Sequence, residues 1–253
     1  MSGYRGLFGA QAGDYRAFRP LWPEEVFTRI LARTPSPHRR ALDLGAGTGL
    51  VAARLLEHFE EVVALEPDAR MLAQVEPRPG LASVNARAED AHFEPRSFEL
   101  VTAGNAFHWM EGVAVLERVR EWLVEHGTVA LFHYNPPHAA EGALEELLAE
   151  EYEVVWREHV HPRLHDLEYT RRTLAASGFG ARMVAQRIPN DLALTRAELL
   201  GFLRSTSYGG GYARSLPEPE DYWRDLEERI HAAAGAGPFV LDFHVELSLA
   251  TKA

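Results

Sequence analysis

Short apolar runs alternate with segments of helical periodicity along the first half of the chain. Apolar residues that recur every three or four positions predict helices, whereas short continuous apolar runs between turn residues predict buried strands. The predicted strands cover residues 41–44, 61–65, 81–85, 98–103 and 127–132. The predicted helices cover residues 23–32, 50–58, 68–74 and 111–124. Strands that alternate with helices in this way predict a doubly wound parallel sheet with crossover helices on both faces.

The rhythm changes after Asn135, where helices become more frequent than strands. Helices are predicted at residues 139–155, 169–177, 195–205 and 220–234, and strands at 181–188 and 239–250. The segments 136–168 and 189–238 are too long to be plain connections, so we expect helical insertions that form a lid over one edge of the sheet. The chain, 1–253, is then one domain whose core comprises residues 36–135, 169–188 and 239–250.

A turn with closely spaced glycines follows the first predicted strand. Residues 41–49 read Ala-Leu-Asp-Leu-Gly-Ala-Gly-Thr-Gly, and a helical pattern begins at Leu50. Glycine has no Cβ, so such a turn can adopt positive φ and let a ligand approach the main chain. The free N–H groups at the start of the following helix then lie beside the bound molecule. The pattern predicts a cofactor site at this turn.

The glycine spacing and the acid after the second strand narrow the class of ligand. A dinucleotide fingerprint needs glycine at position 50, where this chain has Leu50. Glu66 follows the second strand, and a carboxylate at that place accepts hydrogen bonds from a ribose diol. An adenosine-containing ligand without phosphates, such as S-adenosylmethionine, fits both features. A nicotinamide-dependent oxidoreductase is the alternative.

In these segments the chain resembles the class I S-adenosylmethionine-dependent methyltransferases. The matching stretches are Leu42 to Gly49, Val63 to Asp68 with Met71, Ala88 to Asp90, and Phe98 to Val101 leading into Ala106-Phe-His-Trp109. The stretch Tyr15-Arg-Ala-Phe-Arg-Pro20 is similar to one in the small-molecule branch that includes the trans-aconitate methyltransferases. The resemblance implies an α/β, doubly wound, Rossmann-like fold with a seven-stranded sheet whose last strand is antiparallel. It also implies methyl transfer from S-adenosylmethionine.

The resemblance further implies which residues bind each part of the cofactor. The methionine moiety would lie against Gly45, Ala46 and Gly47, with Asp43 beneath them and Asn105 and Ala106 beside them. Glu66 would bind the ribose hydroxyls. Around the adenine, the expected residues are Pro67, Met71, Ala88, Glu89 and Asp90.

The candidate acceptor-binding residues lie before the fold, after the fourth strand and in the second insertion. They are Tyr15, Arg16, Arg19, His108, Trp109, Tyr208 and Tyr212. A hydroxyl or amine acceptor needs a base, for which His108 is the first candidate and His133 the second. A carboxylate acceptor is already ionised and needs only a basic group, such as Arg16 or Arg19, to position it. Tyr208 and Tyr212 flank three glycines, which we interpret as either a mobile lid or a disordered turn.

Asn135-Pro-Pro-His138 is similar to the Asn-Pro-Pro-aromatic motif of methyltransferases that act on amino groups of nucleic-acid bases or glutamine. In those enzymes the motif follows the fourth strand, whereas here it follows the fifth. We therefore interpret Asn135 to Pro137 as the exit of the chain from the fifth strand.

Composition and charge limit the partners. The net charge is −11 without a basic face, so we expect a small-molecule methyl acceptor and no nucleic acid. The chain has no cysteine, and His159, His161 and His165 fit a solvated loop, so no metal is expected. No apolar segment resembles a signal peptide or a membrane span, which predicts a cytoplasmic protein, either a monomer or a homodimer. A non-catalytic protein that binds S-adenosylmethionine, and an enzyme that methylates RNA or protein, are further alternatives.

Overall fold

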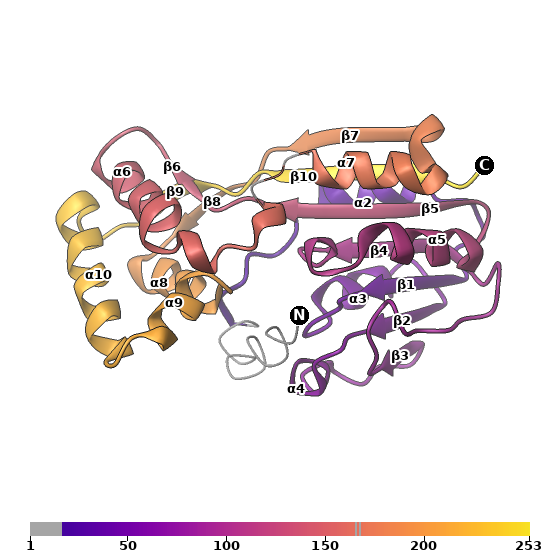
Figure 1. Ribbon diagram of the computed structural model, residues 1–253, viewed down its shortest axis with the longest axis horizontal. Helices are drawn as coiled ribbons and strands as arrows, with labels where there is room; N and C mark the ends of the chain where they lie inside the picture. The colour runs from indigo at the N-terminus through magenta and orange to yellow at the C-terminus, as the bar shows by residue number, and fades with distance from the viewer. Residues whose placement is uncertain (1–16, 165, 167) are drawn as a thin grey trace.

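The computed structural model describes residues 17–253 apart from 165 and 167, and its centre is a seven-stranded sheet (Figure 1). The strand order is β3-β2-β1-β4-β5-β10-β7. The bounds are β1 Arg40–Leu44, β2 Glu61–Leu65, β3 Leu81–Val84, β4 Phe98–Gly104, β5 Leu123–Tyr134, β7 Met183–Ile188 and β10 Val245–Thr251. The pairs among β1 to β5 are parallel, and β10 runs antiparallel to both β5 and β7. The predicted fold class, including the antiparallel last strand, is confirmed.

Helices cover both faces of this sheet, because its central strands are apolar on both sides. α2 (Glu24–Leu31) and α3 (Leu50–Leu55) bury Ile30 and Leu55 in one apolar cluster. α5 (Gly112–Trp122) and α7 (Tyr169–Leu174) bury Val115 and Leu174 in a second cluster on the opposite face. The shorter helical elements near the sheet are α4 Ala69–Leu72, η2 Phe107–Trp109, η6 Ala175–Phe179 and η7 Gly180–Arg182. The two layers leave the carboxyl ends of β1, β2 and β4 as the edge where a ligand can bind.

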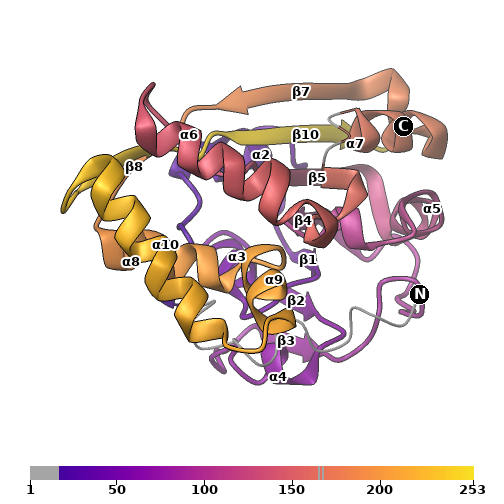
Figure 2. The ribbon, with the colours of Figure 1, turned by 60° about the vertical axis from the view of Figure 1, so that its left-hand side comes forward.

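A second group of elements, which we call the lid, stands at one end of the sheet (Figures 1 and 2). Its strands form a small antiparallel sheet in the order β6-β9-β8, with β6 His138–Ala139, β8 Asp191–Leu194 and β9 Phe239–Asp242. Its helices are α6 Ala143–Glu150, η3 Glu151–Val155, η4 Arg157–His159, η5 Pro162–Leu164, α8 Arg196–Ser205, α9 Gly209–Ser215 and α10 Pro219–Ala234. Across the described residues, none of the helices is long and apolar enough to span a membrane.

Two expectations about the lid are wrong. Residues 239–250 are not one strand but two, because β9 pairs with β8 in the small sheet whereas β10 pairs with β5 in the large one. Residues 208–212 are not a disordered turn, since α9 begins at Gly209. A Cβ at Gly209 would lie 2.8 Å from the carbonyl oxygen of Leu203, so the glycine lets the helix pack closely. Tyr208 is buried, with its ring 5.3 Å from that of Tyr152.

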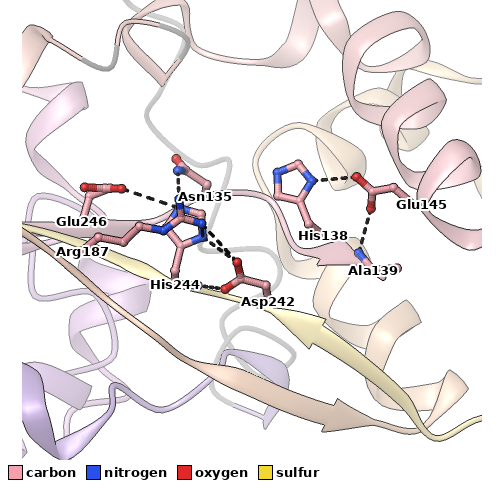
Figure 3. Close-up of polar contacts among 8 residues, drawn as sticks. All are labelled: Asn135, His138, Ala139, Glu145, Arg187, Asp242, His244 and Glu246. Carbon is pink, nitrogen blue, oxygen red and sulfur yellow. Dashed lines mark hydrogen bonds and ion pairs between the residues drawn. The ribbon is translucent and has the colours of Figure 1, made fainter. Parts of the chain in front are cut away.

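Three connections join the lid to the large sheet at one place, which we call the joint. They are residues 135–137 after β5, 189–190 after β7 and 243–244 before β10. His244 is buried at the joint, with Nδ1 3.0 Å from Asp242 Oδ2 and Nε2 3.2 Å from Asn135 Nδ2 (Figure 3). Arg187 of β7 places Nη2 2.9 Å from His244 Nδ1. A single imidazole thus contacts side chains from the ends of β5, β7 and β9.

Candidate functional site

The glycine turn after β1 is held by backbone bonds and close packing. Ala46 N–H donates to the carbonyl of Leu65 at 3.0 Å, which ties the turn to the end of β2. Gly45 and Gly47 have φ of +65° and +58°, a region that favours glycine. A Cβ at Gly45 would lie only 2.5 Å from Cβ of Ala106 in the loop after β4. At Gly45, therefore, glycine is required for packing of protein against protein and for positive φ, rather than to leave room for a ligand.

Glu66 lies at this turn and not in bulk water. Its Oε2 accepts the backbone N–H of Gly47 at 2.9 Å, and its Oε1 accepts that of Asp68 at 2.9 Å. The side chain is nearly buried, with 9% of the residue exposed. Burial raises the pKa of the carboxyl, although the N–H groups of Asp68 and Gly47 act in the opposite direction. The acid after β2 and the glycine turn after β1 thus form one polar site.

Asp43, at the end of β1, has an oxygen without a partner inside the protein. Its Oδ1 accepts the hydroxyl of Thr102 at 2.8 Å, whereas its buried Oδ2 has no hydrogen-bond partner. Burial raises the pKa of Asp43 to about 7, the Thr102 hydroxyl lowers it, and the charge of Glu66 raises it further. Buried polar groups in native proteins are hydrogen-bonded in the great majority of cases, so this oxygen marks a place where a ligand can donate.

A pocket opens beside Asp43 at the carboxyl ends of β1, β4 and β5. Its walls include Arg19, Trp22, Asp43, Gly45, Asn105 and Tyr134. Arg19 is held from two sides, because it donates to the Tyr134 hydroxyl at 3.0 Å and to the Ser205 carbonyl at 3.1 Å. Ser205 is the last residue of α8, so this side chain connects the pocket to the lid.

Asn105 fixes the loop after β4 against the end of β5. Its backbone is left-handed, with φ of +50°, and its Oδ1 accepts the N–H of Tyr134 at 3.1 Å. The Asn105 N–H donates to the carbonyl of Phe132 at 2.8 Å. These bonds hold the following residue, Ala106, against Gly45.

A second pocket lies beyond Ala106, between the loop after β4, the end of β5 and the start of α7. Its walls include Ala106, His108, His133, Arg163 and Tyr169. Burial lowers the pKa of His108 well below its ordinary value, and the charges of His161, His133, Arg163 and Arg19 lower it further. Burial, with the charge of His244, lowers the pKa of His133 to about 4. Both imidazoles are neutral at neutral pH and able to accept a proton.

Arg163 anchors the loop that carries His108. Its Nη1 donates to the carbonyls of His108, at 3.3 Å, and of Met110. Its guanidinium lies 4.9 Å from the centre of the Tyr169 ring, a cation–π contact. Arg163 belongs to η5 of the lid, so it links the lid to the loop after β4. The wall of the second pocket therefore depends on the positions of the lid and of this loop.

Of the residues expected around the adenine, some are buried and others are exposed. Met71 and Ala88 are buried, and Asp90 is exposed. Glu89 Oε1 accepts the N–H of Glu111 at 2.9 Å, and although burial raises the pKa of Glu89, this bond and the neighbouring Arg87 bring it below the ordinary value. Asn85 donates to the carbonyls of Glu66 and Pro67 at 2.8 and 3.1 Å, which fixes the loop after β2.

The structure does not bring all predicted acceptor residues to the pockets. Tyr208 and Tyr212 contact aromatic rings inside the lid, where Tyr212 lies 5.1 Å from the Tyr222 ring. Trp109 packs on His161, with ring centres 4.7 Å apart. Tyr15 and Arg16 lie outside the described residues.

Among the residues that line the pockets, those that sequence reasoning missed include Trp22, Tyr134 and Arg163. Tyr134 carries a usable signal, because it ends β5 on the same edge as the glycine turn. Trp22 and Arg163 carry none, since their positions depend on how the segments outside the sheet fold back onto it.

Comparison with known proteins shows which sequences are similar to this chain. Residues 42–131 match the sequence family described as a methyltransferase domain. A Mycobacterium tuberculosis protein named "Uncharacterized methyltransferase Rv3342" is 33% identical over 125 residues, covering 49% of this chain and 50% of that protein. The yeast protein "Probable S-adenosylmethionine-dependent methyltransferase CRG1", from Saccharomyces cerevisiae, is 24% identical over 259 residues, covering 87% of this chain and 88% of that protein.

The fold agrees with this sequence likeness. The solved structure of "a Putative Type II Methyltransferase from Anaeromyxobacter dehalogenans" superposes with a TM-score of 0.71 at 19% identity, covering 92% of this chain and 97% of that one. The chain spans about half the length of the first curated relatives that it matches.

The sheet order, the glycine turn and the acid after β2 define the class I S-adenosylmethionine-dependent methyltransferases. Residues 42–131 of this chain match the methyltransferase domain, and the fold is that of methyltransferase structures. Glu66 beside the turn, and an Asp43 oxygen without a partner, are chemically suited to S-adenosylmethionine, because a ribose diol and an ammonium both donate hydrogen bonds.

Proposed function

We propose that this protein transfers a methyl group from S-adenosylmethionine to a small-molecule acceptor that binds beside the lid. The observation that carries the proposal is the adjacency of the two pockets. Ala106 packs on Gly45, which lines the first pocket, and also lines the second. A cofactor tail in the first pocket and an acceptor in the second would meet at this residue.

The residues of the first pocket would hold the cofactor. Glu66 would accept hydrogen bonds from the ribose hydroxyls, while the turn from Gly45 to Gly47 would lie along the methionine moiety. When bound, S-adenosylmethionine would supply a sulfonium methyl group, whose carbon bonds in line to the acceptor while its bond to sulfur breaks and S-adenosylhomocysteine leaves. Holding two reactants in contact contributes up to roughly 7–11 kcal/mol in favourable systems, so the fold needs no further catalytic group beyond a base where the acceptor carries a proton.

His108 and His133 supply that base in the second pocket. Because burial keeps the pKa of each imidazole below the ordinary value, both are in the accepting form at neutral pH. His108 follows Ala106 by two positions, which places it nearer in the chain to the methionine end. We assign the base to His108 first and to His133 second.

A small acceptor is supported by the lid and by the charge. The lid reaches the first pocket through the bond from Arg19 to Ser205, which restricts access for a large substrate. The net charge of −11 disfavours a nucleic acid. The stretch from Tyr15 to Pro20 supports the branch that includes the trans-aconitate methyltransferases.

Calorimetry and a turnover assay test the proposal. The chain is titrated with S-adenosylhomocysteine and, for comparison, with reduced nicotinamide dinucleotide. We expect binding of the first ligand only. The chain is then incubated with S-adenosylmethionine and a small-metabolite extract, and S-adenosylhomocysteine formed is measured against a Gly47→Val control. Binding without any product in fractionated extracts would support a non-catalytic binding protein instead.

A further inference from the structure

Residues 17–22, which we call the strap, contribute one wall of the first pocket. Arg19, Pro20 and Trp22 of the strap line this pocket, together with Gly45 of the glycine turn and Asn105 of the loop after β4. The strap lies just before α2 in the chain. A ligand in the first pocket would therefore contact the strap as well as the edge of the sheet.

The other walls are held by backbone hydrogen bonds. Ala46 N–H donates to the carbonyl of Leu65, and Asn105 N–H donates to that of Phe132. Within the part of the chain that the structure describes, residues 20–22 form no backbone hydrogen bond. A segment without such bonds opens at a lower free-energy cost than a hydrogen-bonded turn. The strap is therefore the wall that moves aside most readily.

Side chains attach the strap to β5. The centre of the Trp22 ring lies 4.7 Å from that of Phe132 and 5.1 Å from that of Tyr134. Arg19 Nη1 donates to the Tyr134 hydroxyl at 3.0 Å. Because these contacts join side chains, they can break without disturbing the hydrogen bonds of the sheet.

The strap also packs on α8 of the lid. A Cβ built on Gly201 would lie 2.4 Å from Cγ of Phe18, so the Phe18 ring lies directly on the helix where glycine leaves room for it. Arg19 Nη2 donates to the carbonyl of Ser205, the last residue of the same helix, at 3.1 Å. Glycine disfavours the interior of a helix, and contact with Phe18 is a physical reason for it at this position. The lid thus holds one end of the strap.

We propose that the strap is a gate for the cofactor and that α8 holds this gate closed. The inference rests on the proposed function, in which the first pocket binds S-adenosylmethionine. While α8 lies against Phe18, the strap closes the pocket. When the lid moves away, the strap loses this support, and the cofactor enters or leaves. Exchange of the cofactor is then linked to the position of the lid.

A reversible disulfide between the strap and α8 tests this gate. The chain has no cysteine, so Phe18→Cys combined with Gly201→Cys introduces its only two thiols. Cβ atoms at these positions lie close enough for a disulfide, because Cγ of Phe18 is 2.4 Å from a Cβ at Gly201. Diamide forms the bond, dithiothreitol breaks it, and mass spectrometry counts the free thiols.

Stopped-flow fluorescence measures the association and dissociation rate constants of S-adenosylhomocysteine. The two single-cysteine variants receive the same treatment as controls, and circular dichroism checks that every variant is folded. Phe18→Ala, which removes the ring that lies on Gly201, tests the gate without a cross-link.

We expect the disulfide to lower both rate constants by at least about 10-fold, because the strap can no longer leave α8, and dithiothreitol to restore them. Each single-cysteine variant should show the same rates before and after oxidation. Phe18→Ala should raise both rate constants by about 3-fold or more. Equal changes in both rates leave Kd unchanged, which a structural defect in the pocket would not do.

Other outcomes overturn the inference in distinct ways. Unchanged rates in the oxidised double variant would show that the ligand exchanges while the strap is fixed. Failure of the two cysteines to form the bond would show that Phe18 and Gly201 are not in contact. A loss of affinity through faster dissociation alone would show that the strap shapes the pocket rather than gates it. Failure of the wild-type chain to bind S-adenosylhomocysteine would instead contradict the proposed function, and is recognised before a variant is measured.

Discussion

The Glu66 carboxylate accepts the backbone N–H of Gly47 at 2.9 Å, across the gap between the end of β2 and the turn after β1. Parallel neighbours in a sheet end at the same edge, which is why residues that are 19 positions apart meet here. Glu66, which we assign to the ribose, is therefore held in place by Gly47 of the turn. We assign that turn to the methionine moiety.

Replacing Glu66 by Ala should weaken S-adenosylmethionine binding by about 1.5–3 kcal/mol, because it removes a charged acceptor for the ribose. Calorimetry measures the change. Glu228→Gln, on the exposed face of α10, is the control and should bind as wild type does. Equal affinity in Glu66→Ala and wild type would remove Glu66 from the cofactor site.

Replacing Gly45 by Ala should destabilise the fold, because the new Cβ would lie 2.5 Å from Ala106 Cβ and the backbone φ is +65°. A non-glycine residue in a strained backbone region costs on the order of 1–3 kcal/mol, and the clash adds to it. Chemical denaturation measures the loss. Gly235→Ala is the matched control, since φ is +75° there but nothing lies within 4 Å of the added Cβ.

Adding Ala106→Gly to Gly45→Ala should recover the part of the stability that the clash removes and leave the φ strain. A double variant no more stable than Gly45→Ala would show that contact with Ala106 is not the reason for glycine at position 45.

Asp43 should make folding stability depend on pH. Its pKa rises from 3.8 to about 7 in the folded chain, so the folded state binds the proton more tightly than the unfolded state. Its contribution is fully present below pH 3.8 and is lost as pH rises through about 7. Asp43→Asn removes this term, so its melting temperature relative to wild type should rise between these limits. A difference that is independent of pH would contradict the raised pKa.

His108 should remain neutral at pH values at which an ordinary imidazole is protonated, because its pKa is lowered. NMR of the imidazole resonances as a function of pH measures this protonation. Arg163→Met should raise the pKa of His108, because it removes one of the positive charges that lower it, whereas Arg163→Lys should not. Arg78→Met, an exposed position that pairs with Glu76, serves as the surface control. His133 should titrate near pH 4.

His244→Ala should loosen the joint. The change leaves Asp242 and Asn135 without the imidazole that both contact, and a lost hydrogen bond costs about 0.5–1.5 kcal/mol. Hydrogen exchange should rise first in β8 and β9 and leave β1 and β2 protected. Uniform exchange across both sheets would show that the joint and the large sheet unfold together.

The centre of the large sheet was predictable because β1, β2 and β4 are short, largely apolar runs and helical periods follow β1 and β4. The helix start at Thr195 was also readable, and the structure shows Thr195 and Glu198 forming a capping box. The small sheet was not, since β6 has only two residues and carries no alternating pattern. Helix α9 begins with three glycines, which disfavour a helix, and packing on the Leu203 segment overrides that preference.

In the candidate site, sequence reasoning selected residues at or just after strand ends, such as Asp43, Glu66 and Asn105, because parallel strands place their carboxyl ends at one edge of the sheet. It could not place Tyr208, whose neighbours come from the lid, and it missed Trp22. Side chains outside the sheet take positions that depend on contacts distant in sequence.

The interleaving of β6 with β9 and β8 has a consequence for how this protein can be re-engineered. β6 belongs to the first insertion, β8 to the second and β9 to the residues that follow the second, so neither insertion completes the small sheet alone. A chimaera that grafts one loop from a relative would leave a strand without its partner. Transplanting acceptor preference therefore requires exchanging both segments at once.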